Sequence, residues 1–399
     1  MTFRTPLILA LAVGAFALTS CNENPTEPPS ATPEPALATA TAALAFYQVS
    51  GGERHTCGVT TDNRAYCWGD NLSGQLGDGT TNSSGRSRPA AVLGGLRFHQ
   101  ISAGRLTTCG VTLDYRVYCW GHNGFGQVGD GTNATQLTPV PVAGGRRFRQ
   151  VDVDFYHACA LSYPDPGRAY CWGSNFEGEL GDGTRTNRSA PVAVLGNLVM
   201  RQVTAGAKFS CGVTPTNLAY CWGTNRGGQL GDSSTANWRS VPSRVVGAHQ
   251  FRNLDAGDDH ACAVTTGDRA YCWGNGRSGQ IGNGKTYLSF WPRAVAGGLS
   301  FTRVSAGAAH TCGETRANQT YCWGNNGAGQ AGDGTTTQRL TPVLVTGGLT
   351  FKQVSAGGSH TCGKTDTSEA YCWGFNTSGQ LGNGTTTSSS RPVPVAGPM

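Results

Sequence analysis

The sequence predicts an all-β fold, a closed seven-bladed β-propeller with four-stranded blades, on three observations. First, Tyr-Cys-Trp-Gly occurs seven times, starting at positions 66, 118, 170, 220, 271, 321 and 371. Second, each copy belongs to a repeat of 50 to 52 residues, and a period near fifty with short strands between turns is typical of propellers. Third, 59 glycines among 399 residues and a charged fraction of only 14% indicate tight turns rather than long helices.

The first 45 residues precede the repeats and differ from them in composition. Arg4 is followed by an apolar run over 6–18, which is too short to span a membrane and predicts a signal peptide over 1–20. The four residues LTSC that end at Cys21 resemble the lipobox of bacterial lipoproteins. The resemblance implies cleavage before Cys21 and attachment of lipid to it. The alternative is an ordinary secretory signal followed by a stray cysteine.

Residues 21–45 are rich in proline, threonine and alanine, and they have no pattern that would bury a core. We expect a disordered tether between a lipid on Cys21 and a propeller over 46–399. The sequence therefore predicts an extracytoplasmic protein, anchored by its lipid to a bacterial membrane at the outer membrane or cell surface.

Each repeat contains four short strand candidates. In the first copy they are 46–49, 56–60, 65–68 and 89–92, and none has the apolar spacing of a helix. The chain enters the repeats at a first-strand pattern and leaves them after a last-strand pattern at 392–395. We interpret this as closure by strands from both termini, in which 392–395 joins the first sheet and leaves no open edge.

The two middle strands form a predicted hairpin whose register follows from the cysteines. Cys57 and Cys67 are equidistant from the turn and therefore lie opposite each other. The same register places every repeated Tyr opposite Gly or Ala and every repeated Trp opposite Thr, Ser or Ala, so that a large ring covers a small partner. In the third copy the cysteines are twelve residues apart, and the two extra residues fall in the turn.

The fifteen cysteines divide into the lipid acceptor Cys21 and seven hairpin pairs. A directly opposite pair lies within disulfide reach, and export supplies an oxidising compartment. Zinc is the rival interpretation, but the spacing is not that of a zinc knuckle and each copy has only two thiols. The predicted disulfides join Cys57 to Cys67, Cys109 to Cys119, Cys159 to Cys171, Cys211 to Cys221, Cys262 to Cys272, Cys312 to Cys322 and Cys362 to Cys372.

The consensus VSAGxxHTCGxTxxxxAYCWGxNxxGQLGDGT resembles the repeat of the regulator of chromosome condensation family, over 46–399 and in every copy. The resemblance implies a seven-bladed propeller closed by strands from both termini. The best-known members are nuclear exchange factors for a small GTPase that dock on nucleosomes. A secreted bacterial member inhibits β-lactamases by laying one face over the enzyme. An exported chain meets neither the GTPase nor chromatin, so guanine-nucleotide exchange is the least favoured function.

The charge of the folded part argues against a nucleic-acid partner. Residues 46–399 carry 29 Lys and Arg against 21 Asp and Glu. The arginines are scattered along the chain, with small groups such as Arg146, Arg147 and Arg149, whereas nucleic-acid binding usually needs a concentrated stripe. We therefore expect no nucleic-acid partner.

Two repeated motifs contain potential metal ligands, and we expect both to be structural. One repeat position holds His55, His157, His260, His310 and His360. Equivalent positions in different blades lie far apart, so we expect each of these histidines to bond within its own blade. The GDGT segments carry too few acids for calcium and are interpreted as turns. We predict no catalytic residues, no enzyme activity, no cofactor and no metal.

Departures from the repeat indicate the candidate partner surface. The stretch after the GQLG turn becomes aromatic and basic in copies four and five, where the candidate residues are Trp238, Arg239, Tyr287, Phe290, Trp291 and Arg293. Aromatic rings beside arginines are typical of interface hot spots, and packing between two blades is the alternative. The segment DVDFYH at 152–157 is a second departure and a second candidate for a binding face.

These features predict a monomeric, membrane-tethered scaffold that engages an unidentified envelope protein or glycan through one face. The alternative function is inhibition of a secreted or envelope enzyme, similar to the β-lactamase inhibitor of the family.

Overall fold

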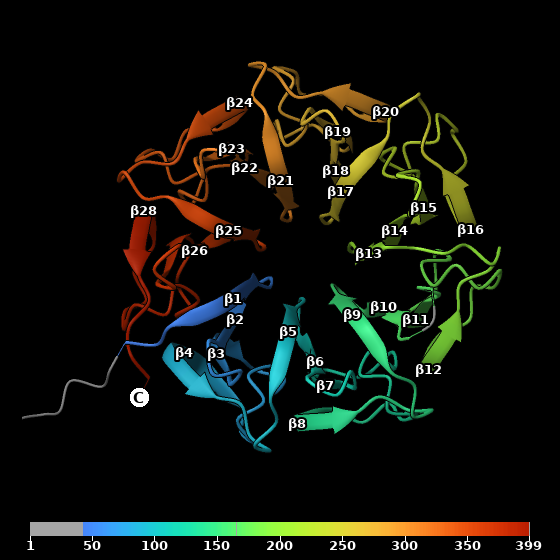
Figure 1. The fold of residues 1–399 in the computed structure, drawn as a ribbon. Coiled ribbons are helices and arrows are strands. Elements are labelled where there is room, and N and C mark those ends of the chain that lie inside the picture. Colours follow the sequence, from blue (N-terminus) through green and yellow to red (C-terminus); the bar gives the residue numbers. More distant parts are fainter. Residues whose placement is uncertain (1–42, 165, 399) are drawn as a thin grey trace, which may run out of the picture. The chain divides into compact units, whose positions relative to one another are not determined.

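The computed structural model describes residues 43–164 and 166–398. They form seven four-stranded antiparallel sheets arranged as the blades of a wheel (Figure 1). This confirms the predicted all-β, seven-bladed propeller. Among the residues so described, no helix has the length and apolar character needed to cross a membrane. The predicted signal peptide 1–20, the predicted lipid acceptor Cys21 and the tether as far as residue 42 lie outside the described residues.

Each blade is one contiguous repeat whose strands follow one another from the centre to the rim (Figure 1). The innermost strands are β1 (Phe46–Gly51), β5 (Phe98–Ala103), β9 (Phe148–Val153), β13 (Gln202–Ala205), β17 (Phe251–Ala256), β21 (Phe301–Ala306) and β25 (Phe351–Ala356). The second strands are β2 (His55–Thr60), β6 (Thr107–Thr112), β10 (His157–Ser162), β14 (Phe209–Val213), β18 (His260–Thr265), β22 (His310–Thr315) and β26 (His360–Thr365). The third strands are β3 (Ala65–Asn71), β7 (Val117–Gly121), β11 (Ala169–Gly173), β15 (Ala219–Thr224), β19 (Ala270–Gly274), β23 (Thr320–Gly324) and β27 (Ala370–Gly374). The outermost strands are β4 (Asn82–Ala91), β8 (Gln136–Pro141), β12 (Arg188–Ala193), β16 (Trp238–Arg244), β20 (Ser289–Ala294), β24 (Arg339–Leu344) and β28 (Ser389–Pro394).

The predicted hairpin register is present in every blade, and it carries the disulfides. Each repeated Cys faces its partner across the second and third strands, including the pair beside the longer turn of blade three. All seven predicted pairs are bonded, with Cα–Cα distances of 4.0–4.1 Å. Each blade is therefore stapled at its middle, and these thiols are not available to zinc.

The repeated tryptophan holds neighbouring blades together. All seven indoles are fully buried, and each Nε1–H donates to the backbone carbonyl of the Gln or Glu in the GQLG-type turn of the preceding blade, at 2.9–3.0 Å. The turn fits only around glycine: Gly231 has a φ of +62°, and a Cβ there would lie 2.7 Å from the Trp273 Nε1. The apolar core accordingly lies between blades, where Cys211 and Leu230 of blade four pack with Phe251 and Trp273 of blade five.

The ring closes between the first and last blades, and here one prediction is wrong. Segment 392–395 does not join the first sheet, because β28 pairs with β27 of its own blade while β4 completes blade one. In every copy the turn after the third strand returns the chain to its own sheet, so no strand is left to exchange. The termini nevertheless meet: β1 packs against β26, and Trp68 Nε1 donates to the Gln380 carbonyl at 3.0 Å. The closing interface uses the bonds that join the other blades.

Candidate functional site

A closed ring of hydrogen bonds surrounds the axial channel. In each blade one Ser, Thr or Asp side chain accepts a hydrogen bond from a backbone N–H of the next blade, at 2.9–3.3 Å. The seven side chains are those of Ser50, Ser102, Asp152, Thr204, Asp255, Ser305 and Ser355. Members of the ring line a cavity of about 130 Å³ on one side and one of about 690 Å³ on the other. The ring therefore separates two mouths of the channel.

The wider mouth is lined by glutamines, by basic side chains and by Glu314, with the ring members Asp152 and Asp255 at its inner end. We call it the basic mouth; its cations are Arg149, Arg201, Arg252, Arg303, Lys352 and Lys364. The fold thus gathers basic residues that are scattered along the sequence. Three of these cations stabilise contacts between blades: Arg149, Arg201 and Arg252 each donate a hydrogen bond to a backbone carbonyl of the next blade at 2.6–2.8 Å.

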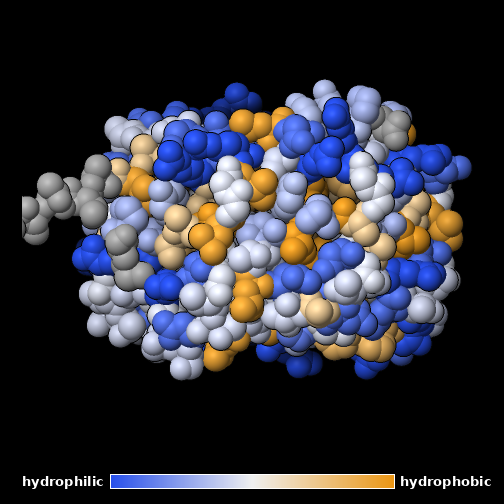
Figure 2. Space-filling view, turned by 90° about the horizontal axis from the view of Figure 1, so that it is seen from below, coloured by the Kyte–Doolittle hydropathy of each residue, from blue (hydrophilic) through white to orange (hydrophobic). Residues whose placement is uncertain are grey.

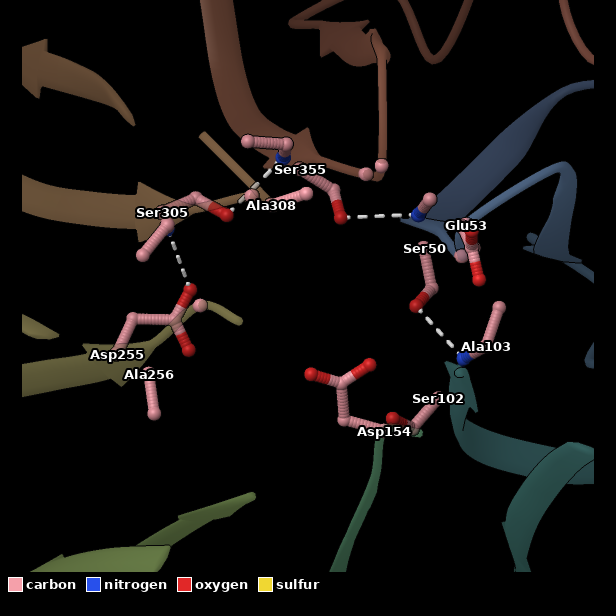
Figure 3. A pocket seen from close by; sticks show the side chains of 18 of the residues that line it. Ser50, Glu53, Ser102, Ala103, Asp154, Asp255, Ala256, Ser305, Ala308 and Ser355 are labelled. Carbon is pink, nitrogen blue, oxygen red and sulfur yellow. Dashed lines mark hydrogen bonds between the residues drawn. The ribbon is translucent and has the colours of Figure 1, made fainter. Parts of the chain in front are cut away.

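The narrower mouth is acidic. It opens on the face of the wheel where the innermost strands end, and we call this face the acidic face. The acidic mouth consists of Glu53, Asp154 and Asp258 with the ring members Asp152 and Asp255. No Lys or Arg is among the described residues that line it. Arg105 lies at its edge and pairs with Glu53 at 2.7 Å. In Figure 3 the Asp154 carboxylate points into the middle of the channel, with no hydrogen bond drawn to it.

Asp154 stands where the other six blades carry glycine. A Cβ on any of those glycines would lie 2.1–2.7 Å from a backbone carbonyl of the next blade. The six glycines are Gly52, Gly104, Gly206, Gly257, Gly307 and Gly357. Blade three accommodates the larger residue by relaxing locally: the Asp154 N–H lies 3.3 Å from the His157 carbonyl, against 2.8–2.9 Å in the equivalent bonds. The repeat therefore does not require a carboxylate here.

Burial and mutual repulsion raise the pKa values of these acids. Burial raises the pKa of Asp154 well above its ordinary value, and the charge of Asp258 raises it further. Burial, followed by the charge of Asp152, raises the pKa of Asp255 to about 7. Burial, followed by the charge of Asp259, raises the pKa of Asp258 to about 7. A cation in the mouth would relieve this repulsion.

Asp154→Gly is expected to stabilise the fold at pH 8, and to stabilise it less at pH 4.5. Because the pKa of Asp154 is raised above 3.8 in the folded state, this carboxyl favours folding only while it is protonated, and the advantage disappears as the pH rises through the raised pKa. Glycine has no carboxylate to charge. Urea unfolding at both pH values measures the effect, and an equal gain at both values would contradict it.

The repeated histidines bond between blades, so the expectation of a bond within one blade is wrong. His55 Nε2 lies 2.8 Å from Thr108 Oγ1 of the next blade, and that hydroxyl donates to the Gln75 carbonyl. The imidazole therefore donates from Nε2. The other four histidines make the same contact. Burial lowers the pKa of His55 to about 3, so the ring is neutral at physiological pH.

The two blades without this histidine show that the contact is a matched pair. Thr107 and Phe209 occupy the histidine position, and the facing residues of the next blades are Ala158 and Ala261 in place of Thr or Ser. Hydroxyl and imidazole are thus lost together. This covariation among repeats is a sequence signal for the blade interface.

The GDGT segments are turns, as predicted. Asp78 Oδ1 accepts hydrogen bonds from the Thr80 N–H at 3.1 Å and the Thr80 hydroxyl at 2.7 Å, while Oδ2 pairs with Arg86 at 2.6 Å. Within residues 43–164 and 166–398 no group of three His, Cys, Asp or Glu side chains is arranged to hold a metal ion.

The candidate partner residues of copies four and five lie on neighbouring outermost strands. Trp238 opens β16 and is 39% exposed, while Trp291 of β20 is 43% exposed. Each indole has a guanidinium over its face: Arg185 of blade three at 4.8 Å from Trp238, and Arg293 at 4.4 Å from Trp291.

The remaining candidates differ in their surroundings. Tyr287 is exposed, Phe290 is half-buried, and Arg239 pairs with Asp232 at 3.4 Å. The innermost strands end at the acidic face, and neighbouring strands are antiparallel, so the outermost strands begin at this face. Trp238, at the beginning of β16, and Tyr287, just before β20, therefore lie on the acidic face. On the side of the rim shown in Figure 2, apolar side chains are dispersed among polar ones.

A second aromatic group lies on the acidic face. We call it the aromatic shelf: Phe125, Phe155, Tyr156 and Phe176. Ring centroids are 4.8 Å apart for Phe125 and Tyr156, 5.8 Å for Phe125 and Phe176, and 5.1 Å for Phe155 and Tyr156. Phe155 and Tyr156 belong to the predicted segment 152–157. Phe125 and Phe176 come from turns of two blades, so sequence inspection missed them.

The described residues define a disulfide-bonded propeller with an axial channel and two mouths of different charge. Residues 165–399 match the RCC1-like domain model, while 46–75, 98–127, 62–111 and 114–161 match models of the regulator of chromosome condensation (RCC1) repeat. The chain belongs to this family, as its repeat predicts.

Relatives match the chain over different shares of their own length. The human E3 ubiquitin-protein ligase HERC2 is 29% identical over 247 residues, which cover 60% of this chain but 5% of HERC2. The Arabidopsis thaliana ultraviolet-B receptor UVR8 is 31% identical over 251 residues, 62% of this chain and 57% of UVR8. The chain therefore spans only part of these relatives.

Solved structures share the fold at lower identity. Human WBSCR16 superposes with a TM-score of 0.76 at 19% identity, covering 84% of this chain and 94% of that one. Yeast RCC1 (Prp20), solved with Kap60 bound, gives a TM-score of 0.74 at 18% identity, covering 94% and 91%.

Proposed function

We propose that the protein is a binding scaffold, tethered to a bacterial membrane through lipid on Cys21, that holds an envelope protein or glycan against its acidic face. One observation carries the proposal: this face gathers exposed and half-buried aromatic rings beside guanidinium groups, on a wheel whose blades are bonded at every interface. Such rings are typical hot spots, and a rigid surface loses little entropy on binding.

Replacing Trp238 and Trp291 together by alanine is expected to lower recovery of envelope partners at least ~10-fold in a pull-down, because two exposed anchors are lost. Tyr47→Ala is the matched control, since Tyr47 is an exposed aromatic residue at the basic mouth. Unchanged recovery with the double variant would show that these two tryptophans do not contribute to partner binding.

A second candidate function is inhibition of a secreted or envelope enzyme. The acidic mouth favours it, because a rigid concave surface can cover an enzyme's entrance. Inhibition of a β-lactamase by the purified protein at nanomolar concentration would support this function, and full enzyme activity at micromolar concentration would oppose it.

A further inference from the structure

We propose that the acidic mouth receives a Lys or Arg side chain of a polypeptide partner, whose neighbouring apolar residues pack on the aromatic shelf. The inference rests on the proposed binding function and specifies the chemistry of the partner.

The acids of the mouth are additions to the repeat. Asp152 and Asp255 stand where four other blades have Ser, Asp154 where six have Gly, and Asp258 where two have Ala. None of these carboxylates is therefore needed to build a blade. Asp154 is half-buried, makes no hydrogen bond with its carboxylate among the described residues, and points into the channel (Figure 3). Like charges so placed are costly unless a cation joins them.

The geometry favours an organic cation over a metal ion. The described carboxylates do not form a group that could hold a metal, and a hard cation needs six to eight oxygen ligands at about 2.3–2.6 Å. An ammonium or guanidinium group tolerates looser contacts, and the mouth offers about 130 Å³. Arg105 illustrates the chemistry at its edge, because its guanidinium pairs with Glu53 at 2.7 Å and lies 4.0 Å from the centroid of Phe155.

The shelf favours a polypeptide over an amino sugar or a polyamine. Arg105 contacts both Glu53 and Phe155, so the shelf adjoins the mouth. Its rings are inclined to one another by 56°, 87° and 85°. This arrangement provides edges and faces for apolar side chains, whereas sugar rings stack on a flat face. Phe176 is 54% exposed and is available to such contacts.

The test uses the full chain and an array of heptapeptides with Arg at the centre and varied apolar neighbours. A second array carries citrulline, which has the shape of Arg without its charge. We expect Arg peptides to bind at least tenfold more tightly than their citrulline counterparts, and binding to weaken with added salt. Asp154→Gly and Asp258→Ala, each a residue that other blades carry, should weaken binding at least tenfold. Phe176→Ala should weaken it severalfold, and Tyr47→Ala should not change it.

Three results would overturn the inference: equal binding of the Arg and citrulline arrays, binding unaffected by both acidic variants, or preference for chitosan oligomers or spermine over every peptide. The proposed function is tested separately by envelope pull-down. Capture that persists unchanged in Asp154→Gly would reject the acidic mouth while the scaffold function stands. Absence of any captured partner would reject the function itself.

Discussion

Complete reduction of the seven disulfides is expected to leave the propeller unfolded. Each bridge closes a loop with a sequence separation of 10 or 12 residues. Closure of so short a loop contributes about 3 kcal/mol by restricting the unfolded chain, so seven bridges contribute roughly 20 kcal/mol. A typical domain is stable by only about 5–15 kcal/mol.

The measurement is refolding from urea with and without reductant, followed by tryptophan emission and circular dichroism. Because the sulfurs are buried, reduction is carried out in urea. A control variant in which only Cys211 and Cys221 become alanine should still fold, with a loss of about 3 kcal/mol. A fully reduced protein that regains the native spectrum and unfolds cooperatively would contradict the expectation.

Trp222→Ala is expected to lower the free energy of unfolding by about 3–5 kcal/mol. The indole is fully buried at the interface of blades three and four, and its Nε1–H donates to the Glu179 carbonyl at 2.9 Å. The substitution leaves a cavity and removes one of the two hydrogen bonds that the Glu179 carbonyl accepts, the other coming from the Ser210 hydroxyl. Urea unfolding of the oxidised protein measures the loss.

Trp238→Ala is the matched control, because this tryptophan lies in the same blade but is 39% exposed. We expect it to cost less than about 1 kcal/mol. Equal losses for the two variants would mean that the repeated indole does not hold blades together.

The sequence sufficed for the blade because the constraints within a hairpin are local. Cysteines equidistant from a turn must face each other, so the register of β2 and β3 followed from spacing alone, and the disulfides followed from that register and the predicted export. The seven copies repeated this test independently. Even the longer turn of blade three kept Cys159 opposite Cys171.

Contacts between blades were harder to predict, because they join residues about fifty positions apart or at opposite ends of the chain. The assignment of 392–395 to the first sheet failed for this reason, since the pairing partner of an outer strand depends on the path of the preceding turn. The sequence shows that Thr107 replaces the repeated His in the blade whose neighbour has Ala158 in place of the hydroxyl residue. Only the structure shows that these two positions are in contact between blades.

The acidic mouth was beyond sequence inspection for a related reason. Its acids come from blades one, three and five, and they converge only because the innermost strands point their ends at one axis. The departure at 152–157 marked two members, Asp152 and Asp154. Trp238 and Trp291 were visible because they interrupt the polar stretch after the GQLG turn in two consecutive copies. Their role in binding stays a prediction.

The central claim is that seven bridged hairpins build one rigid wheel, and peptide mapping of the unreduced protein by mass spectrometry tests it most directly. The account predicts seven linked peptide pairs, each joining the second and third strands of one blade, from Cys57 with Cys67 to Cys362 with Cys372. Free thiols at these fourteen positions, or bridges between different blades, would contradict it.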